Sequence, residues 1–261
     1  MKLGEDVKAI WVASAPRTGS MWTFNIVRDL VRSTGRTVLP EIVPHEDEVM
    51  EAIGKAGIAA SDGATYVLKV HTPIPQDLQK SLFVVTRRDL HDAFVSFMRF
   101  TTSDFDNALR YLAGSVRLER HYEGFPPERT INIAYADIIA QPAAVIAEIG
   151  RRLSINPDAA VIDALTKRYS KDSVKARMAE REAALRAKIN NRQPVDKRDF
   201  VPSMDKSIIR AFDTETGFQS GHVSAYQEGD WRRILTPAQQ WMVDKLIADV
   251  RAEPDLSMLY R

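Results

Sequence analysis

The segment Pro16-Arg17-Thr18-Gly19-Ser20 combines residue types that bind anions, and it joins an apolar run to a stretch with helical spacing. A strand, a loop and a helix in this order bring backbone N–H groups and the positive end of the helix dipole to one point, where a phosphate binds well. Gly19 permits close approach to the backbone, and Arg17 offers a charged guanidinium. The hydroxyls of Thr18 and Ser20 can donate to phosphate oxygens. The alternative interpretation is a tight turn in which Ser20 caps the helix.

A second segment, Arg88 to Phe97, begins where another apolar run ends and contains Arg88 and Ser96, eight residues apart. Eight helical residues rise about 12 Å, so one phosphate held by both side chains requires Arg88 to fold back along the helix. Taken alone, the segment fits equally well a capped amphipathic helix whose polar face, with Asp92 and Ser96, is exposed.

The third segment, Lys69-Val70-His71-Thr72-Pro73, also follows an apolar run of strand length. Imidazole titrates near neutral pH and is therefore suited to act as a general base. A single His is more often a hydrogen-bonded structural residue. Its position beside Lys69 at a strand end favours the catalytic interpretation, because sites of α/β proteins assemble at the carboxyl ends of their strands.

In their order and residue types these segments resemble the motifs of PAPS-dependent sulfotransferases, PAPS being 3′-phosphoadenosine 5′-phosphosulfate. The family's P-K-S-G-T-T-W, K-T-H-L-P, R-D-x-x-D-x-x-x-S, Y-E-D-L and G-D-W-K are matched from Pro16, Lys69, Arg88, Tyr135 and Gly229 onward. Three departures stand out: Arg17 replaces Lys, Met21 removes a hydroxyl, and Ala225 and Tyr226 stand where relatives carry R-K-G.

The resemblance implies PAPS as co-substrate, no metal, and a role for each matched residue. His71 would be the general base, and Lys69 and Arg17 would stabilise the transferred group and the leaving phosphate. Arg88 and Ser96 would bind the 3′-phosphate, and Gly221 and His222 could replace the absent R-K-G. The nucleotide contacts expected in this way are Arg17, Thr18, Gly19, Ser20, Trp22, Arg88, Ser96, Tyr135, Gly221 and His222.

The elements that must position these residues alternate between strand-length and helical patterns. Apolar runs predict strands over 9–14, 65–70, 82–86 and 130–135, and helical spacing follows the first, the third and the fourth of them. This pattern predicts a three-layer α/β fold, similar to P-loop NTPases, with a mostly parallel sheet between helices and a helical C-terminal third. We expect one domain over residues 1–261.

Composition narrows the function classes. The chain has no Cys, which excludes disulfides and thiolate chemistry, and its net charge of +1 argues against nucleic-acid binding. We find no export signal and no apolar stretch long enough to span a membrane, and therefore expect a cytoplasmic protein. Residues 167–192 contain nine Lys or Arg against three acids, which indicates either a solvated helix or a basic lid over an anion.

Two other functions remain as alternatives. A P-loop kinase or NTPase shares the strand–loop–helix order, but the sequence lacks G-x-x-x-x-G-K-[ST]. A non-catalytic protein could keep the nucleotide fold and hold an anionic partner with residues 167–192. The acceptor could be a phenol, sugar, lipid or small alcohol, and residues 240–261 contain no clear dimerisation motif.

Overall fold

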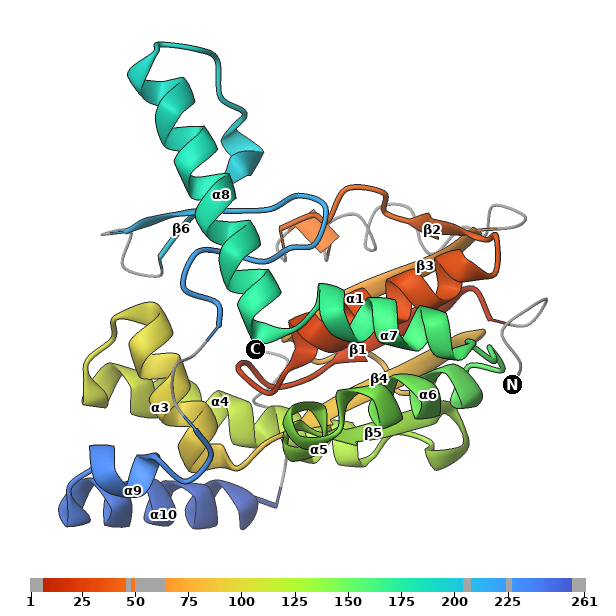
Figure 1. Cartoon of the computed structure of the whole chain (residues 1–261). Helices are drawn as coiled ribbons and strands as arrows, with labels where there is room; N and C mark the ends of the chain where they lie inside the picture. Colours follow the sequence, from red (N-terminus) through yellow and green to blue (C-terminus); the bar gives the residue numbers. More distant parts are fainter. Residues whose placement is uncertain (1–6, 46–47, 50–63, 204–207, 224–226, 255–261) are drawn as a thin grey trace.

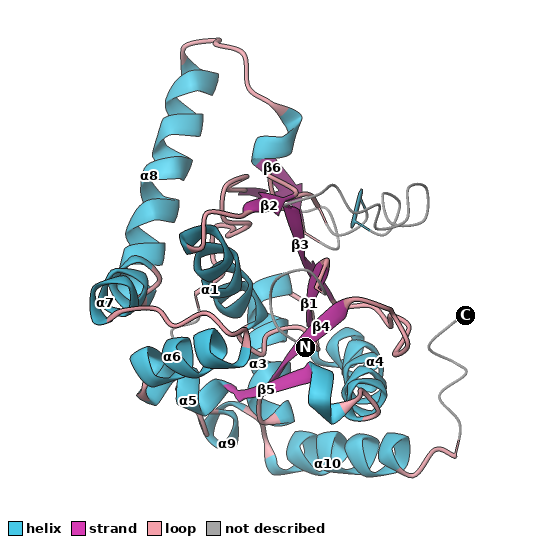
Figure 2. Ribbon diagram, turned by 90° about the vertical axis from the view of Figure 1, so that its right-hand side faces the viewer, coloured by secondary structure: helices cyan, strands magenta, loops and turns pink. Residues whose placement is uncertain are grey.

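The computed structural model describes residues 7–45, 48–49, 64–203, 208–223 and 227–254. Its centre is a five-stranded parallel sheet in the order β2-β3-β1-β4-β5. The strands are β1 (Ala9–Ala13), β2 (Thr37–Leu39), β3 (Ala64–Val70), β4 (Ser81–Arg87) and β5 (Thr130–Ala134). Helices lie on both faces (Figures 1 and 2). The predicted fold class is confirmed, and β2 is a strand that the sequence did not predict.

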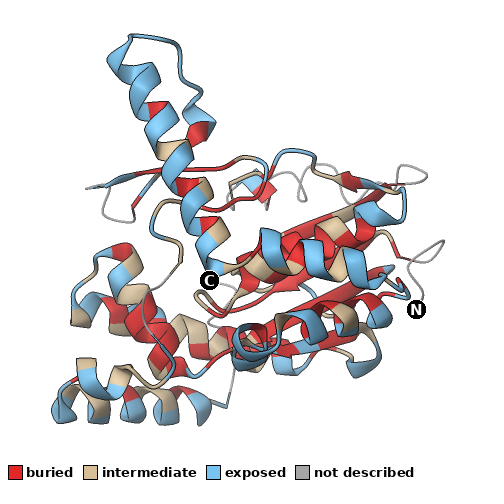
Figure 3. Ribbon diagram, in the orientation of Figure 1, coloured by how far each residue is buried: buried red, intermediate tan, exposed pale blue. Residues whose placement is uncertain are grey.

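Both faces of the sheet are buried, which explains why the strands are continuous apolar runs (Figure 3). In β1, alternate side chains point to opposite faces. Ile10 and Val12 belong to the hydrophobic cluster that includes α1 (Ser20–Ser33) and α6 (Pro142–Arg152). Trp11 belongs to the cluster on the other face, with residues of α4 (Phe105–Glu123).

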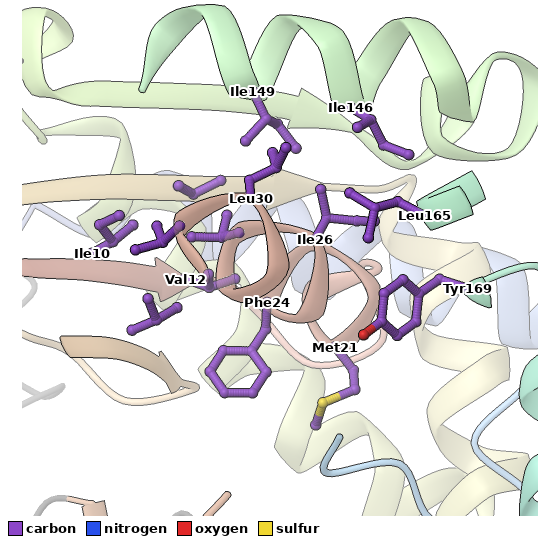
Figure 4. Packing of buried hydrophobic residues seen from close by; sticks show 14 of the residues in the cluster. Ile10, Val12, Met21, Phe24, Ile26, Leu30, Ile146, Ile149, Leu165 and Tyr169 are labelled. Carbon is purple, nitrogen blue, oxygen red and sulfur yellow. The ribbon is translucent and has the colours of Figure 1, made fainter. Parts of the chain in front are cut away.

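Helix α1 lies directly after β1 and fixes the loop between them. Its apolar residues Phe24, Ile26 and Leu30 are buried in the first of these two clusters. In Figure 4 Leu30 lies beside Ile149 of α6 and Ile26 lies beside Leu165, while Phe24 points away from α6. Burying side chains of this size stabilises the fold by roughly 1.5–3 kcal/mol each. The loop between β1 and α1 is therefore held at the carboxyl edge of the sheet by two elements whose apolar side chains lie in the core.

The remaining helices follow the predicted order. Asp89 caps α3 through an acceptor bond from the Asp92 N–H, so this helix starts where the sequence predicted. The described helices not yet given are α3 (Leu90–Thr101), α5 (Tyr135–Ala140), α7 (Ala159–Arg168), α8 (Lys171–Asn190), α9 (Trp231–Ile234) and α10 (Pro237–Arg251), with the 3-10 turns Pro127–Arg129 and Lys197–Asp199. A small antiparallel pair, β6 (Phe200–Pro202) and β7 (Ile209–Ala211), lies beyond α8.

Helix α8 projects from the body of the protein (Figures 1 and 2). It buries only Val174, Met178 and Leu185, and most of its other residues are charged or polar. None of the helices in the described part of the chain has the length and apolar character that a membrane span requires.

Candidate active site

The loop between β1 and α1 has the backbone of an anion-binding turn. Arg17 has φ +68° and Gly19 has φ +94°, both in the left-handed region. Gly19 is the N-cap of α1 and Ser20 is its first helical residue, so Ser20 does not cap the helix as the turn interpretation required. A left-handed non-glycine residue is strained, and such residues concentrate at functional sites.

Gly19 is required at its position for a second reason. A Cβ atom there would lie 2.9 Å from Cδ1 of Ile138 and 3.0 Å from Cδ2 of Tyr135. The start of α5 therefore packs directly on the loop. This packing brings the predicted adenine-side residue Tyr135 next to the loop, although the two are more than 100 residues apart in sequence.

The hydroxyl of Thr18 has a role that the sequence did not predict. It is fully buried, donates to the carbonyl of Ala15 at 2.8 Å and lies 2.7 Å from Oγ1 of Thr86. Thr86 in turn donates from its hydroxyl to Oγ of Ser14 at 2.8 Å and from its N–H at 3.0 Å. These three hydroxyls fasten the loop to β4. The Thr18 side chain is therefore directed away from the cavity, and only its backbone remains a candidate ligand.

His71 and Lys69 lie in direct contact at the end of β3. Nδ1 of His71 lies 2.6 Å from the carbonyl oxygen of Ser14. Because a carbonyl can only accept, Nδ1 carries the proton and Nε2 carries the lone pair. Nε2 lies 3.0 Å from Nζ of Lys69. The tautomer is thus the one that a base acting through Nε2 needs.

Arg88 and Ser96 both converge on Arg17. Arg88 donates from Nη1 to the carbonyl of Arg17 at 3.2 Å, and Arg17 donates from Nε to Oγ of Ser96 at 3.1 Å. Arg88 is 8% exposed and Ser96 is 2% exposed. Arg17 therefore links Arg88 to Ser96, and the burial of Ser96 contradicts the exposed-helix alternative.

Two aromatic residues, Tyr135 and Trp22, also lie at this site. The guanidinium of Arg88 lies 4.2 Å from the ring centroid of Tyr135, a cation–π contact. Trp22 is partly buried, packs against the core cluster and also lines the cavity described below. The structure is thus consistent with both a core and a ligand-facing role for Trp22.

Asp92 joins two segments that lie far apart in the sequence. Both of its carboxylate oxygens accept from the N–H of Gly229, at 3.0 and 2.8 Å, and its side chain is buried. Gly229 has φ +86°. The second Asp of the R-D-x-x-D pattern therefore anchors the G-D-W turn to α3, a role that the sequence did not predict.

His222 lies near Arg17, Lys69 and His71. Its carbonyl accepts from Nη2 of Arg17 at 2.8 Å, and its Nδ1 accepts from the N–H of Gln219. Burial, followed by the charges of Arg17, Lys69 and His71, holds the pKa of His222 well below its usual value. Gly221 is exposed with φ +79°, and residues 224–226, where relatives carry R-K-G, lie outside the described residues. The substitution of R-K-G by Gly221 and His222 stays a prediction.

One cavity of about 640 Å³ is lined by most of the predicted site residues, but not by Thr18 or Gly221. The predicted residues that line it are Arg17, Gly19, Ser20, Trp22, Lys69, His71, Arg88, Ser96, Tyr135 and His222. Among the described lining residues five are Arg or Lys and none is Asp or Glu. Burial and the charge of Arg88 lower the pKa of Arg17 to about 10, so Arg17 stays charged at neutral pH. The rest of the lining includes a group of aromatic residues, namely Phe24, Phe97, Phe100, Tyr111, Phe212 and Phe218. The cavity therefore suits a ligand with an anionic group next to an apolar group.

The cations of residues 167–192, the basic segment, fall into two groups. Arg168, Arg177, Arg181 and Arg186 form ion pairs with acidic side chains, at distances of 2.5 to 3.4 Å. Lys171, in contrast, lines the cavity. Four of the nine cations in residues 167–192 are thus ion-paired, and Lys171 is the one that reaches the cavity. In the part of the chain that is described, no cluster of His, Asp and Glu could hold a metal ion.

Comparisons with known proteins agree with this geometry. The sequence model of the sulfotransferase family matches residues 73–159, a segment that contains Arg88, Ser96 and Tyr135. A search of curated proteins found no match.

Several solved structures have the same fold. Retinol dehydratase in complex with androsterone and PAP, the inactive cofactor, has a TM-score of 0.61 at 14% identity, covering 97% of this chain and 83% of that one. Mouse sulfotransferase SULT7A1 with PAP has a TM-score of 0.59 at 14% identity, covering 100% and 89%. Retinol dehydratase with retinol and PAP has a TM-score of 0.57 at 17% identity, covering 97% and 84%. At these identities the likeness shows the fold alone.

Proposed function

We propose that this chain, which carries the sequence pattern of the sulfotransferase family in residues 73–159 and the fold of sulfotransferases, transfers a sulfuryl group from PAPS. The observation that carries the proposal is the cavity, whose charged lining residues in the described chain are all cationic and which holds His71 and Lys69 in contact. PAP, the desulfated product, is bound in the similar structures. The reaction needs such a site because both phosphates and the moving group are anionic.

In the proposed reaction an acceptor oxygen or nitrogen attacks sulfur in line with the bond to the 5′-phosphate. The new bond to sulfur forms as the bond between sulfur and the phosphate oxygen breaks, and the electron pair leaves with PAP. His71 takes the acceptor proton on Nε2, the nitrogen that its bond to the Ser14 carbonyl leaves unprotonated. Lys69 and Arg17 stabilise the negative charge on the moving group and the leaving phosphate.

We further propose that the acceptor is a small, largely apolar molecule with a hydroxyl or amine. Nine Trp, Tyr and Phe side chains of the described residues line the same cavity as the cations. Similar structures hold androsterone and retinol. A polysaccharide would need many hydrogen-bonding groups, which aromatic walls do not supply. The expected single domain and cytoplasmic location stay predictions.

Calorimetric titration with PAP and with ATP, on the protein and on an Arg88→Ala variant, tests the nucleotide assignment. We expect PAP to bind in preference to ATP, and the variant to lose that preference. A folded protein that prefers ATP would support the kinase alternative instead.

A His71→Ala variant tests the base. We expect turnover with a good acceptor to fall by roughly 10²–10⁴-fold while PAP affinity stays nearly unchanged. If turnover persists, His71 is not the base.

A further inference from the structure

Arg88 is a buried cation that forms no ion pair with a carboxylate of the described residues. It is 8% exposed, its Nη1 donates to a backbone carbonyl, and its Nε has no hydrogen-bond partner in the described structure. Burying an unpaired charge is costly, and a ligand anion removes that cost when it binds. Arg88 also lines the cavity. It therefore marks the point at which an anionic group of the ligand is expected.

A second cation, Lys171, lines the same cavity as Arg88. Lys171 is the first residue of α8, has an exposed side chain at the rim of the cavity and forms no ion pair with a described carboxylate. Partial burial, followed by the like charges of Arg88 and Lys175, lowers the pKa of its ammonium group, and the charge of Glu228 raises it. Arg88 and Lys171 carry like charges and line one cavity, so an anion that binds between them stabilises both.

Lys171 differs from the other cations of residues 167–192 because it lines the cavity and they do not. Arg168, Arg177 and Arg181 point to acidic partners on other elements. Lys175, one turn further along α8, is exposed and does not line the cavity. The segment thus contributes a single cation to the ligand site, at the end of α8 that lies against the body of the protein (Figure 1).

We propose that Lys171 binds the ribose 3′-phosphate together with Arg88, and so supplies the cation that R-K-G supplies in relatives. This inference rests on the proposed function, because it assumes a nucleotide with a 3′-phosphate. A phosphate monoester accepts several hydrogen bonds at once. The ammonium group of Lys acts on it as a compact charge, and the guanidinium of Arg can donate two parallel hydrogen bonds to it.

The experiment is a calorimetric titration with two probes, PAP and adenosine 5′-phosphate, which lacks the 3′-phosphate. The proteins are the wild type, Lys171→Met, Lys171→Arg and the matched control Lys175→Met. We expect Lys171→Met to weaken PAP binding by roughly tenfold or more and to leave adenosine 5′-phosphate binding unchanged. Lys171→Arg should retain most of the PAP affinity, and Lys175→Met should match the wild type.

Three results would overturn the inference. If the wild type prefers PAP and Lys171→Met keeps that preference, Lys171 does not bind the 3′-phosphate and the proposed function still stands. If Lys171→Met weakens both probes equally, its role lies elsewhere in nucleotide binding. If the folded wild type shows no preference for PAP, the proposed function and the inference fail together.

Discussion

The three buried hydroxyls under the phosphate loop make Thr86→Val the most informative stability test. Valine keeps the volume of threonine and removes the hydroxyl, which bonds to Ser14 Oγ at 2.8 Å and to Thr18 Oγ1 at 2.7 Å. After the change, Ser14 Oγ still accepts from the residue 86 N–H, and Thr18 still donates to the carbonyl of Ala15. The variant therefore loses two hydrogen bonds and leaves neither Ser14 nor Thr18 without a partner.

The number of hydrogen bonds lost sets the expected loss of stability. A hydrogen bond contributes about 0.5–1.5 kcal/mol net, so two bonds give a loss of about 1–3 kcal/mol. For a chain of this size 1 kcal/mol shifts the melting temperature by about 2–4 °C, which gives a fall of roughly 2–12 °C. PAP affinity should fall as well, because the hydroxyls hold the loop in register with β4.

Thermal unfolding followed by circular dichroism, and calorimetry with PAP, measure the two effects. The matched control is Thr86→Ser, which keeps the hydroxyl and loses a methyl group. If Thr86→Val is as stable as Thr86→Ser and binds PAP as well, the hydroxyl bridge does not position the loop, and the reasoning is refuted.

Two further changes test the site and the fold. Gly19→Ala should impair folding or PAP binding, as judged by circular dichroism and calorimetry, because its φ is +94° and its Cβ would meet Ile138 at 2.9 Å; normal stability and binding would contradict this account. Burial raises the pKa of Glu119 to about 7 in the folded protein, so stability should fall by up to about 3 kcal/mol as the pH rises from about 4.5 to about 7. Glu119→Gln should abolish that fall in melting temperature, and an unchanged pH profile would show that Glu119 is not its source.

The sequence predicted those parts of the molecule that depend on local pattern. Both faces of the sheet are covered, so β1, β3, β4 and β5 are uninterrupted apolar runs and could be found directly. The three-residue strand β2 has too few residues to show a pattern. The loop between β1 and α1 could be placed because the order of strand, loop and helix is itself local.

Interactions between distant segments could not be predicted from pattern. The Thr18 hydroxyl was expected to face a ligand, and its actual partner, Thr86, lies 68 residues away. Lys171 could not be distinguished from the other cations of residues 167–192, because the positions of their acidic partners depend on the tertiary fold.

Helix α3 explains why the exposed-helix interpretation of Ser96 failed. Amphipathic spacing separates an apolar face from a polar one, and the polar face usually meets water. In α3 both faces are buried: Leu90 and Phe94 pack in a hydrophobic cluster, while Asp92 and Ser96 meet a backbone N–H and the guanidinium of Arg17. Spacing cannot distinguish water from a polar protein partner, because both satisfy the same side chains. At the carboxyl edge of a parallel sheet, where a helix starts beside an anion loop, the polar face is therefore better interpreted as part of the binding site than as surface.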